Sequence, residues 1–210
     1  PEELTLQDET KVKAHNQAYR TKILRNKTRV DIDDYLTDEF SGEAVKFIEN
    51  NSDNPFFLYL PYNAPHGPIQ APEKYVNSFP NIKNPLRKVY AGMISSMDDG
   101  IGKIVSKLKE QNIYNNTIIF FLSDNGAPKK RWTEKERANY PFSGYKGSDL
   151  GEGGVRTPFF MQWPNKSIAQ SIYNNPVSSF DIFATMKSII NPDVKLPNHS
   201  HGKNILPYVL

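Results

Sequence analysis

The chain has 210 residues, of which 38% are hydrophobic and 12% aromatic, a composition that excludes a largely disordered protein. Its 26 basic and 23 acidic residues nearly balance, and the most basic stretch, residues 129–137, is diluted by two glutamates, which argues against a nucleic-acid-binding surface. The lack of cysteine excludes disulfides and thiolate metal sites within these residues, and no apolar run approaches the roughly 20 residues that span a bilayer.

The first half of the sequence contains two segments with helical periodicity and one apolar segment with the length of a strand. Residues 1–36 are polar and weakly patterned, although a helix is expected over part of 7–26. Apolar residues at helical spacing predict an amphipathic helix over 36–51, and the same periodicity runs through 86–111. Between them, "NPFFLYLPY" at 54–62 predicts a short buried strand closed by Pro61.

The second half predicts two further strands and a helix. Apolar runs at 117–122 and 157–164 have the length of strands, and 178–191 is patterned as a helix. The order of strand, long helix and strand between 54 and 122 is that of a βαβ unit, which would place two parallel strands side by side beneath helices. We therefore predict an α/β fold with a largely parallel or mixed central sheet flanked by helices.

Polar residues lie in the loops that follow the predicted strands, where open α/β sheets bind their ligands. His66 follows the strand at 56–60, Asp124 and Asn125 follow the strand at 117–122, and Lys146 lies in the glycine-rich loop beyond. Each has a simpler interpretation by itself. A histidine between prolines can merely hold a loop, Asp-Asn-Gly is a common turn sequence, and a single lysine is usually an exposed surface residue.

Taken together, the same residues indicate a cationic site for a tetrahedral anion. A carboxylate and an amide carbonyl are hard oxygen ligands, which suit Ca²⁺ or Mg²⁺. A lysine and a histidine converging on that ion would bind a sulfate or phosphate ester, and the histidine could protonate the departing oxygen. The metal and the lysine would stabilise charge that develops in the transition state. Glycines around Lys146 allow the tight backbone needed to bring it inward.

Five motifs occur in order from Tyr35 onward: "YLTDEFSGEAVKFI", "PFFLYLPYNAPHGPIQAPEKY", "YAGMISSMDDGIGKIVSKLKEQNIYNNTIIFFLSDNG", "GYKGSDLGEGGVRTPFFMQWP" and "GKNILPYV". In this order they resemble the formylglycine-dependent, arylsulfatase-like sulfatases of the alkaline-phosphatase-like superfamily. The resemblance implies that Asp124 and Asn125 ligate a divalent metal, with Ca²⁺ expected and Mg²⁺ as the alternative. It implies that His66 contacts the sulfate and the leaving-group oxygen and that Lys146 binds the sulfate, so both are expected to be catalytic. Arg156 matches the family's "EGGxR" arginine and is expected to shape the loop.

The sequence also departs from the family pattern. The family's nucleophile is a Cys or Ser in a C/S-x-P-S/A-R signature that is oxidised to formylglycine, and its hydrate attacks the sulfur. That signature is absent here, as are the paired aspartates that complete the metal site. We therefore expect residues 35–210 to be the central and C-terminal part of a sulfatase catalytic domain, with an incomplete fold. Residues 1–34 are left unassigned, and the nucleophile is expected upstream.

The expected function is hydrolysis of a sulfated small molecule or carbohydrate by the full-length protein, with these residues alone inactive. Two alternatives remain open: a phosphate or phosphonate ester hydrolase of the same superfamily, and a catalytically inactive fragment or pseudoenzyme. Family members are typically exported or lysosomal, so a periplasmic, secreted or lysosomal location is expected. Asn-x-Ser/Thr sequons agree weakly with a secretory route, at Asn26, Asn50, Asn115, Asn165 and Asn198. The sequence indicates no oligomeric state.

Overall fold

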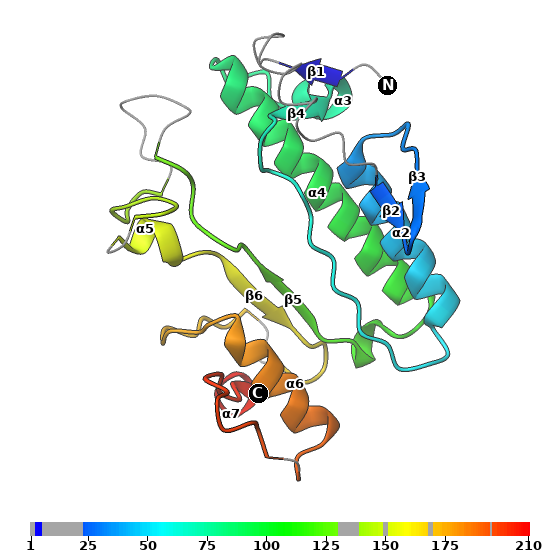
Figure 1. Cartoon of the computed structure of the whole chain (residues 1–210), viewed down its shortest axis with the longest axis vertical. Helices are drawn as coiled ribbons and strands as arrows, with labels where there is room; N and C mark the ends of the chain where they lie inside the picture. The colour runs from blue at the N-terminus through cyan, green and yellow to red at the C-terminus, as the bar shows by residue number, and fades with distance from the viewer. Residues whose placement is uncertain (1–2, 6–22, 130–138, 149–150, 168–169, 194) are drawn as a thin grey trace. The chain divides into compact units, whose positions relative to one another are not determined.

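The computed structural model describes residues 3–5, 23–129, 139–148, 151–167, 170–193 and 195–210 (Figure 1). The chain divides into two units, Pro1–Tyr114 and Asn115–Leu210, and each is considered by itself. The first contains β1 (Glu3–Thr5), β2 (Ile23–Arg25), β3 (Thr28–Val30), α2 (Leu36–Asn51), β4 (Gln70–Pro72), α3 (Glu73–Val76) and α4 (Pro85–Glu110). A 3₁₀ turn, η1 (Tyr114–Asn116), precedes β5 (Ile119–Leu122), α5 (Glu152–Val155), β6 (Phe159–Gln162), α6 (Phe180–Ile190) and α7 (Leu206–Val209).

The packing of α2 against α4 forms the core of the first unit (Figure 1). The helix α4 begins at Asn84, whose side chain accepts a hydrogen bond from the Arg87 N–H at 3.1 Å and so caps a free helix donor. Its buried apolar residues recur at helical spacing, as do those of α2. The helices predicted over 36–51 and 86–111 are therefore confirmed.

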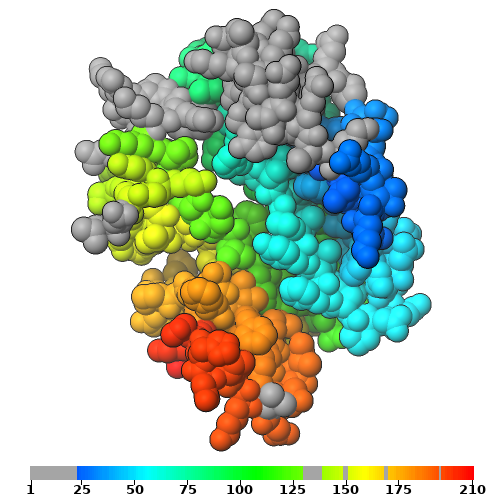
Figure 2. All heavy atoms as spheres, in the orientation of Figure 1, coloured from blue at the N-terminus to red at the C-terminus, as the bar shows by residue number. Residues whose placement is uncertain are grey.

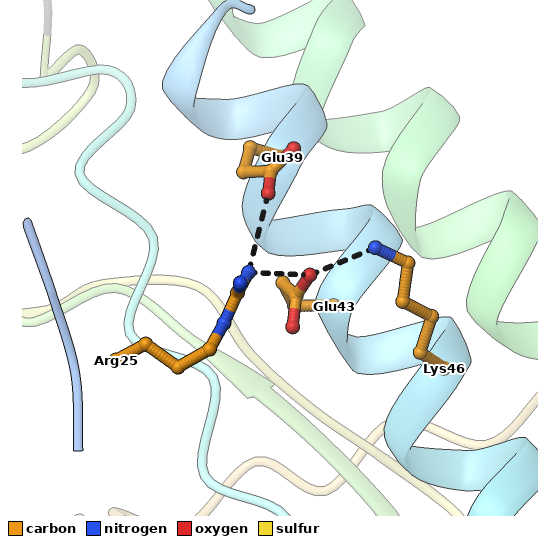
Figure 3. Close-up of polar contacts among 4 residues, drawn as sticks. All are labelled: Arg25, Glu39, Glu43 and Lys46. Atoms are coloured by element: carbon orange, nitrogen blue, oxygen red, sulfur yellow. Dashed lines mark hydrogen bonds and ion pairs between the residues drawn. The ribbon is translucent and has the colours of Figure 1, made fainter. Parts of the chain in front are cut away.

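A hairpin of β2 and β3 precedes α2. The two strands pair antiparallel, and Asn26 between them has a φ of 56°, a left-handed conformation that asparagine tolerates in tight turns. Arg25 lies 2.9 Å from Glu43 and 3.7 Å from Glu39, and Lys46 shares Glu43 at 2.9 Å (Figure 3). These pairs are largely exposed, so each contributes little stability. Residues 23–25 form β2, so a helix within 7–26 could lie only before them, and residues 6–22 lie outside the described residues.

The strand predicted over 54–62 does not form, because the segment has no strand beside it. Among the described residues, no backbone hydrogen bond joins 55–61 to another segment. Side chains nevertheless alternate: Phe56 packs edge-on against Phe47 of α2, whereas Phe57 and Tyr59 are 75% and 76% exposed. The segment follows α2 and runs along α4 at the surface (Figures 1 and 2). It has the side-chain pattern of a strand without the pairing that defines one.

Two antiparallel strands, β5 and β6, form the sheet of the second unit. Phe120 contacts Phe159, and Phe121 contacts Phe160, with ring centroids 6.1 Å apart in each pair. The strands predicted at 117–122 and 157–164 are confirmed, as is the helix at 178–191, which is α6. The parallel pair predicted with the 54–62 strand is not present: in the part of the chain that the structure describes, every strand pair is antiparallel.

The buried carboxylate of Asp181 fixes the C-terminal segment of the second unit to α6. Its two oxygens accept backbone hydrogen bonds from Ser178 and Lys203, both at 2.7 Å. Thr185, one turn further along α6, accepts a third from the Ile205 N–H at 3.1 Å. Of the described helices in either unit, none combines the length and apolarity needed to cross a membrane.

Three tyrosines of the first unit make its stability sensitive to alkaline pH. Burial raises the pKa of the Tyr62, Tyr75 and Tyr90 phenols above the ordinary value of 10.0. The stability they contribute is therefore complete below pH 10.0 and is lost as pH rises through the higher folded-state pKa values. Urea denaturation from neutral to alkaline pH should show this loss, and it should be smaller in Tyr62→Phe, which cannot ionise at that position. An equal alkaline loss in that variant would exclude a contribution from Tyr62.

Candidate functional site

A turn at the end of β5 presents Asp124 and Asn125. The Ser123 N–H donates to the Pro158 carbonyl at 3.2 Å, and the Thr157 hydroxyl donates to the Ser123 carbonyl at 3.0 Å, so residues before β6 hold the end of β5. The Ser123 hydroxyl donates to the Asn125 carbonyl at 3.0 Å and closes the turn. These hydrogen bonds hold the end of β5 as far as Ser123, and the next side chain, Asp124, is exposed.

The donor atoms of this turn fit one side of a hard cation site. The Asn125 Nδ2 donates to the Gly126 carbonyl at 3.0 Å, which fixes the amide and leaves its Oδ1 available. The Asp124 carboxylate has no hydrogen bond or ion pair with any described residue. A carboxylate and an amide oxygen suit Ca²⁺, which takes about 6–8 oxygen ligands. The described residues contain no group of three or more His, Cys, Asp or Glu able to hold a metal, so the turn supplies only part of such a set.

Glycine at position 126 is required by a close backbone approach. A Cβ on Gly126 would overlap the Gly153 carbonyl, and the Gly126 N–H donates to the Gly154 carbonyl at 2.9 Å. The glycine of the Asp-Asn-Gly turn therefore lets the segment around α5 pack directly against the backbone after Asn125. This explains the turn's third residue without reference to ligands.

Lys146 lies on a short turn that is tied to the residues after Asn125. Gly144 and Gly147 flank the lysine with φ values of 93° and 80°, a region that only glycine adopts freely. The Tyr145 N–H donates to the Ser148 hydroxyl at 2.9 Å, and the Lys146 N–H donates to the Ala127 carbonyl at 3.0 Å. The structure thus brings Asp124, Asn125 and Lys146 into one loop cluster, which consists of residues 123–127 and 139–148. The Lys146 side chain is exposed and has no partner among the described residues.

Arg156 makes contacts that stabilise the same loop cluster. Its guanidinium lies 4.5 Å from the centroid of the Phe142 ring and pairs with Glu152 at 3.3 Å. Both partners belong to the segments that flank Lys146 in the sequence. These contacts fit the role of loop shaping that the sequence motif implied.

His66 lies in the first unit, in the loop between the 56–60 segment and β4. Its backbone N–H donates to the Asn63 carbonyl at 2.9 Å, and its Nδ1 lies 2.9 Å from the Gly67 carbonyl. A carbonyl only accepts, so Nδ1 carries the proton and Nε2 is the ring atom left to exchange one. The ring keeps the same hydrogen bond whether Nε2 is protonated or not. The side chain is exposed.

A family model described as Sulfatase matches residues 5–191 of the chain. This match covers most of the sequence, including all four predicted site residues. The chain belongs to the sulfatase family. The sulfatase interpretation of the sequence motifs, four of which lie within the matched residues, is therefore confirmed.

Relatives with curated names are also sulfatases. The chain is 35% identical over 175 residues to an arylsulfatase of Hemicentrotus pulcherrimus, covering 83% of this chain and 30% of the relative. It is 32% identical over 176 residues to the N-acetylgalactosamine-6-sulfatase of Homo sapiens, covering 83% of this chain and 32% of the relative. The chain thus spans about a third of the length of the curated relatives it matches.

The fold is that of solved sulfatase-like structures. The structure of Ps i-CgsB in complex with k-i-k-neocarrahexaose superposes with a TM-score of 0.83 at 38% sequence identity, over 96% of this chain and 46% of that chain. The α/β, alkaline-phosphatase-like fold expected from the sequence is confirmed. The absence of the strand predicted over 54–62 does not alter this fold class.

One polar residue of the sulfatase loop cluster was not predicted from the sequence. Asn139 hydrogen-bonds through its side chain to the backbone of Ala127 and Gly144. Its partners are 12 and 5 positions away, and it follows the charged stretch 129–137 in a loop without periodicity. No local sequence signal separates such an asparagine from a solvent-exposed one.

Proposed function

We propose that the whole protein hydrolyses sulfate esters. The match of the sulfatase family model over residues 5–191 carries this proposal, and the named relatives support it. The nucleophile is proposed to be a formylglycine that lies outside these residues, because the C/S-x-P-S/A-R signature does not occur within them. The reaction cleaves the S–O bond and releases an alcohol and inorganic sulfate.

The chain's own residues are proposed to bind the sulfate and to handle the leaving-group proton. Lys146 is exposed on a turn fixed to Ala127, so its ammonium is available to an anion and its backbone is held in place. It would bind a sulfate oxygen and stabilise negative charge that grows in the transition state. His66, oriented through Nδ1 by the Gly67 carbonyl, would deliver a proton from Nε2 to the departing oxygen.

Asp124 and Asn125 are proposed to hold a divalent cation, with Ca²⁺ favoured over Mg²⁺. The two residues are consecutive in the turn after β5, and flexible mixed carboxylate and carbonyl sites suit the larger ion. A bound cation would supply positive charge against the sulfate oxygens. The remaining ligands would come from outside the described residues, which contain no group of three or more His, Cys, Asp or Glu able to hold a metal.

Sulfated carbohydrate is the proposed substrate class. The solved structure at 38% identity is a complex with k-i-k-neocarrahexaose, and curated relatives include N-acetylgalactosamine-6-sulfatases. A sulfated oligosaccharide is therefore a better first substrate to test than a sulfated small molecule. An extracytoplasmic location, where such carbohydrates occur, belongs to the same proposal.

Reading the coding sequence upstream of Pro1 and assaying the encoded whole protein tests this function. We expect an in-frame C/S-x-P-S/A-R signature and an export signal. The protein should hydrolyse an aryl sulfate and a sulfated galactan oligosaccharide faster than the matched aryl phosphate. Chelation should remove the activity, and Ca²⁺ should restore it.

Three results would contradict parts of the proposal. Faster hydrolysis of the aryl phosphate would support a phosphate ester hydrolase of the same superfamily. A start codon near Pro1 without the signature would support an inactive protein. Activity that survives exhaustive chelation would remove the cation from the proposal.

A further inference from the structure

The side chain of Asn139 is fully engaged by backbone groups within the second unit. Its Oδ1 accepts a hydrogen bond from the Ala127 N–H at 2.9 Å. Its Nδ2 donates to the Ala127 carbonyl at 3.1 Å and to the Gly144 carbonyl at 3.2 Å. A carboxamide has one acceptor oxygen and two N–H donors, so every polar group of this half-buried side chain has a partner.

These hydrogen bonds join the two halves of the loop cluster. Ala127 lies two residues after Asn125, and Gly144 lies two residues before Lys146. The Ala127 carbonyl that accepts from Asn139 also accepts from the Lys146 N–H at 3.0 Å. One carboxamide thus fixes the end of the proposed metal-binding turn and the start of the lysine turn.

Apart from the backbone hydrogen bond of Lys146 to Ala127, Asn139 supplies the side-chain connection between the two turns. Among the described residues, no other side chain hydrogen-bonds to Ala127 or Gly144. A Cβ on Gly153 would come 2.9 Å from the Asn139 Cβ, so the asparagine is packed as well as hydrogen-bonded. Loss of the carboxamide would leave the Ala127 N–H and the carbonyls of Ala127 and Gly144 with one partner fewer each in this packed region.

We propose that Asn139 is a positioning residue that sets Lys146 relative to the Asp124–Asn125 turn. The inference rests on the proposed function in assigning Lys146 to the sulfate. Within the described part of the chain, Asn139 hydrogen-bonds to backbone groups alone, so we assign it an action on the reaction through Lys146 and not a catalytic role of its own. A misplacement of about 1 Å at a binding group can cost about 100-fold in rate, which sets the expected size of the effect.

A double-mutant cycle in the whole protein tests this inference. Asn139→Ala is expected to lower kcat/KM for an aryl sulfate by about 100-fold. In the Lys146→Ala background, where no lysine remains to be positioned, the same change should cost less than about tenfold, because residues that act as a unit are not additive. Asn139→Asp should resemble Asn139→Ala, since its carboxylate can still accept from Ala127 but faces two carbonyl oxygens without a proton to donate. Asn174→Ala, an exposed loop asparagine in the same unit, is the matched control and should leave kcat/KM unchanged.

Two kinetic outcomes would overturn the role of Asn139. A 100-fold loss that persists in the Lys146→Ala background would show that Asn139 does not act through the lysine. Unchanged kcat/KM in Asn139→Ala, measured on the folded fraction, would show a purely structural role.

Hydrogen exchange separates failure of this inference from failure of the proposed function. The Ala127 and Lys146 amides are expected to exchange faster in Asn139→Ala than in the wild type or in Asn174→Ala. If the wild-type protein hydrolyses no sulfate ester, the proposed function fails and the exchange rates still decide whether Asn139 fixes the two loops. Unchanged exchange at both amides would overturn the inference on its own.

Discussion

Lys146→Ala in the whole sulfatase is expected to lower kcat/KM for sulfate esters by about 100- to 1,000-fold, the range found when one preorganised donor to a developing negative charge is removed. Its side chain is exposed and has no partner among the described residues, so the fold should lose little. Exposed substitutions of this kind usually change stability by less than about 0.5 kcal/mol. Steady-state kinetics on an aryl sulfate, together with urea denaturation of the same preparations, would separate the two effects.

A second exposed lysine of the same unit provides the control for this prediction. Lys166 lies in the turn after β6, and its backbone N–H donates to the Trp163 carbonyl at 3.0 Å. Lys166→Ala removes the same charge from the same unit and should leave kcat/KM unchanged. Lys146→Arg should recover part of the lost rate, because it restores the charge with a different shape. Equal kinetics for Lys146→Ala and Lys166→Ala would refute the assignment of Lys146 to the sulfate.

Helices were predictable from the sequence because their determinants are local. The apolar residues of α4 recur at helical spacing along the chain, and Asn84 and Pro85 mark its start. The same holds for α2, whose buried residues Thr37, Ser41, Ala44 and Ile48 lie on one face. The boundaries of both helices agree with the prediction to within one residue.

Strand pairing was less predictable because it depends on distant segments. The 54–62 segment has the apolar content and the alternating burial of a strand, and Phe56 packs against Phe47 of α2. No described segment supplies the backbone partner, however, so the predicted parallel pair is missing; Phe57 and Tyr59, on the other face of the segment, are exposed. Side-chain alternation predicts which face of a strand is buried, but it does not predict whether a second strand pairs with it.

The candidate site was predictable only in part for a related reason. Asp124, Asn125 and Lys146 stand at positions where a strand end or a glycine-rich loop identifies them, and the structure gathers them into one loop cluster. Asn139 was not predicted because its hydrogen bonds with described residues are all to backbone atoms, which carry no sequence identity. The roles of Asp124, Asn125, Lys146 and His66 in sulfate ester hydrolysis stay predictions.

Gly100→Ala is expected to destabilise the first unit by about 1–3 kcal/mol, because it overpacks the contact between α2 and α4. A Cβ at this position would overlap the Ser41 Oγ and come 2.9 Å from the Tyr62 hydroxyl. Those two hydroxyls lie 2.9 Å apart, and Ser41 also donates to the Thr37 carbonyl at 2.8 Å, so neither can move without losing a buried hydrogen bond. Urea denaturation should show an earlier midpoint with an unchanged slope.

Gly102→Ala, two residues further along α4, separates this packing effect from helix propensity. A Cβ there has no atom within 4 Å, so the change should stabilise the helix by about 1 kcal/mol, the usual difference between alanine and glycine. Ser41→Gly combined with Gly100→Ala moves the small residue to the other helix and should destabilise less than the sum of the two single changes. Equal and favourable effects of Gly100→Ala and Gly102→Ala would mean that α2 and α4 do not approach closely at Gly100. Stability changes of opposite sign in the two variants would show that position 100 needs glycine for close contact between the helices, although glycine has a low helix propensity.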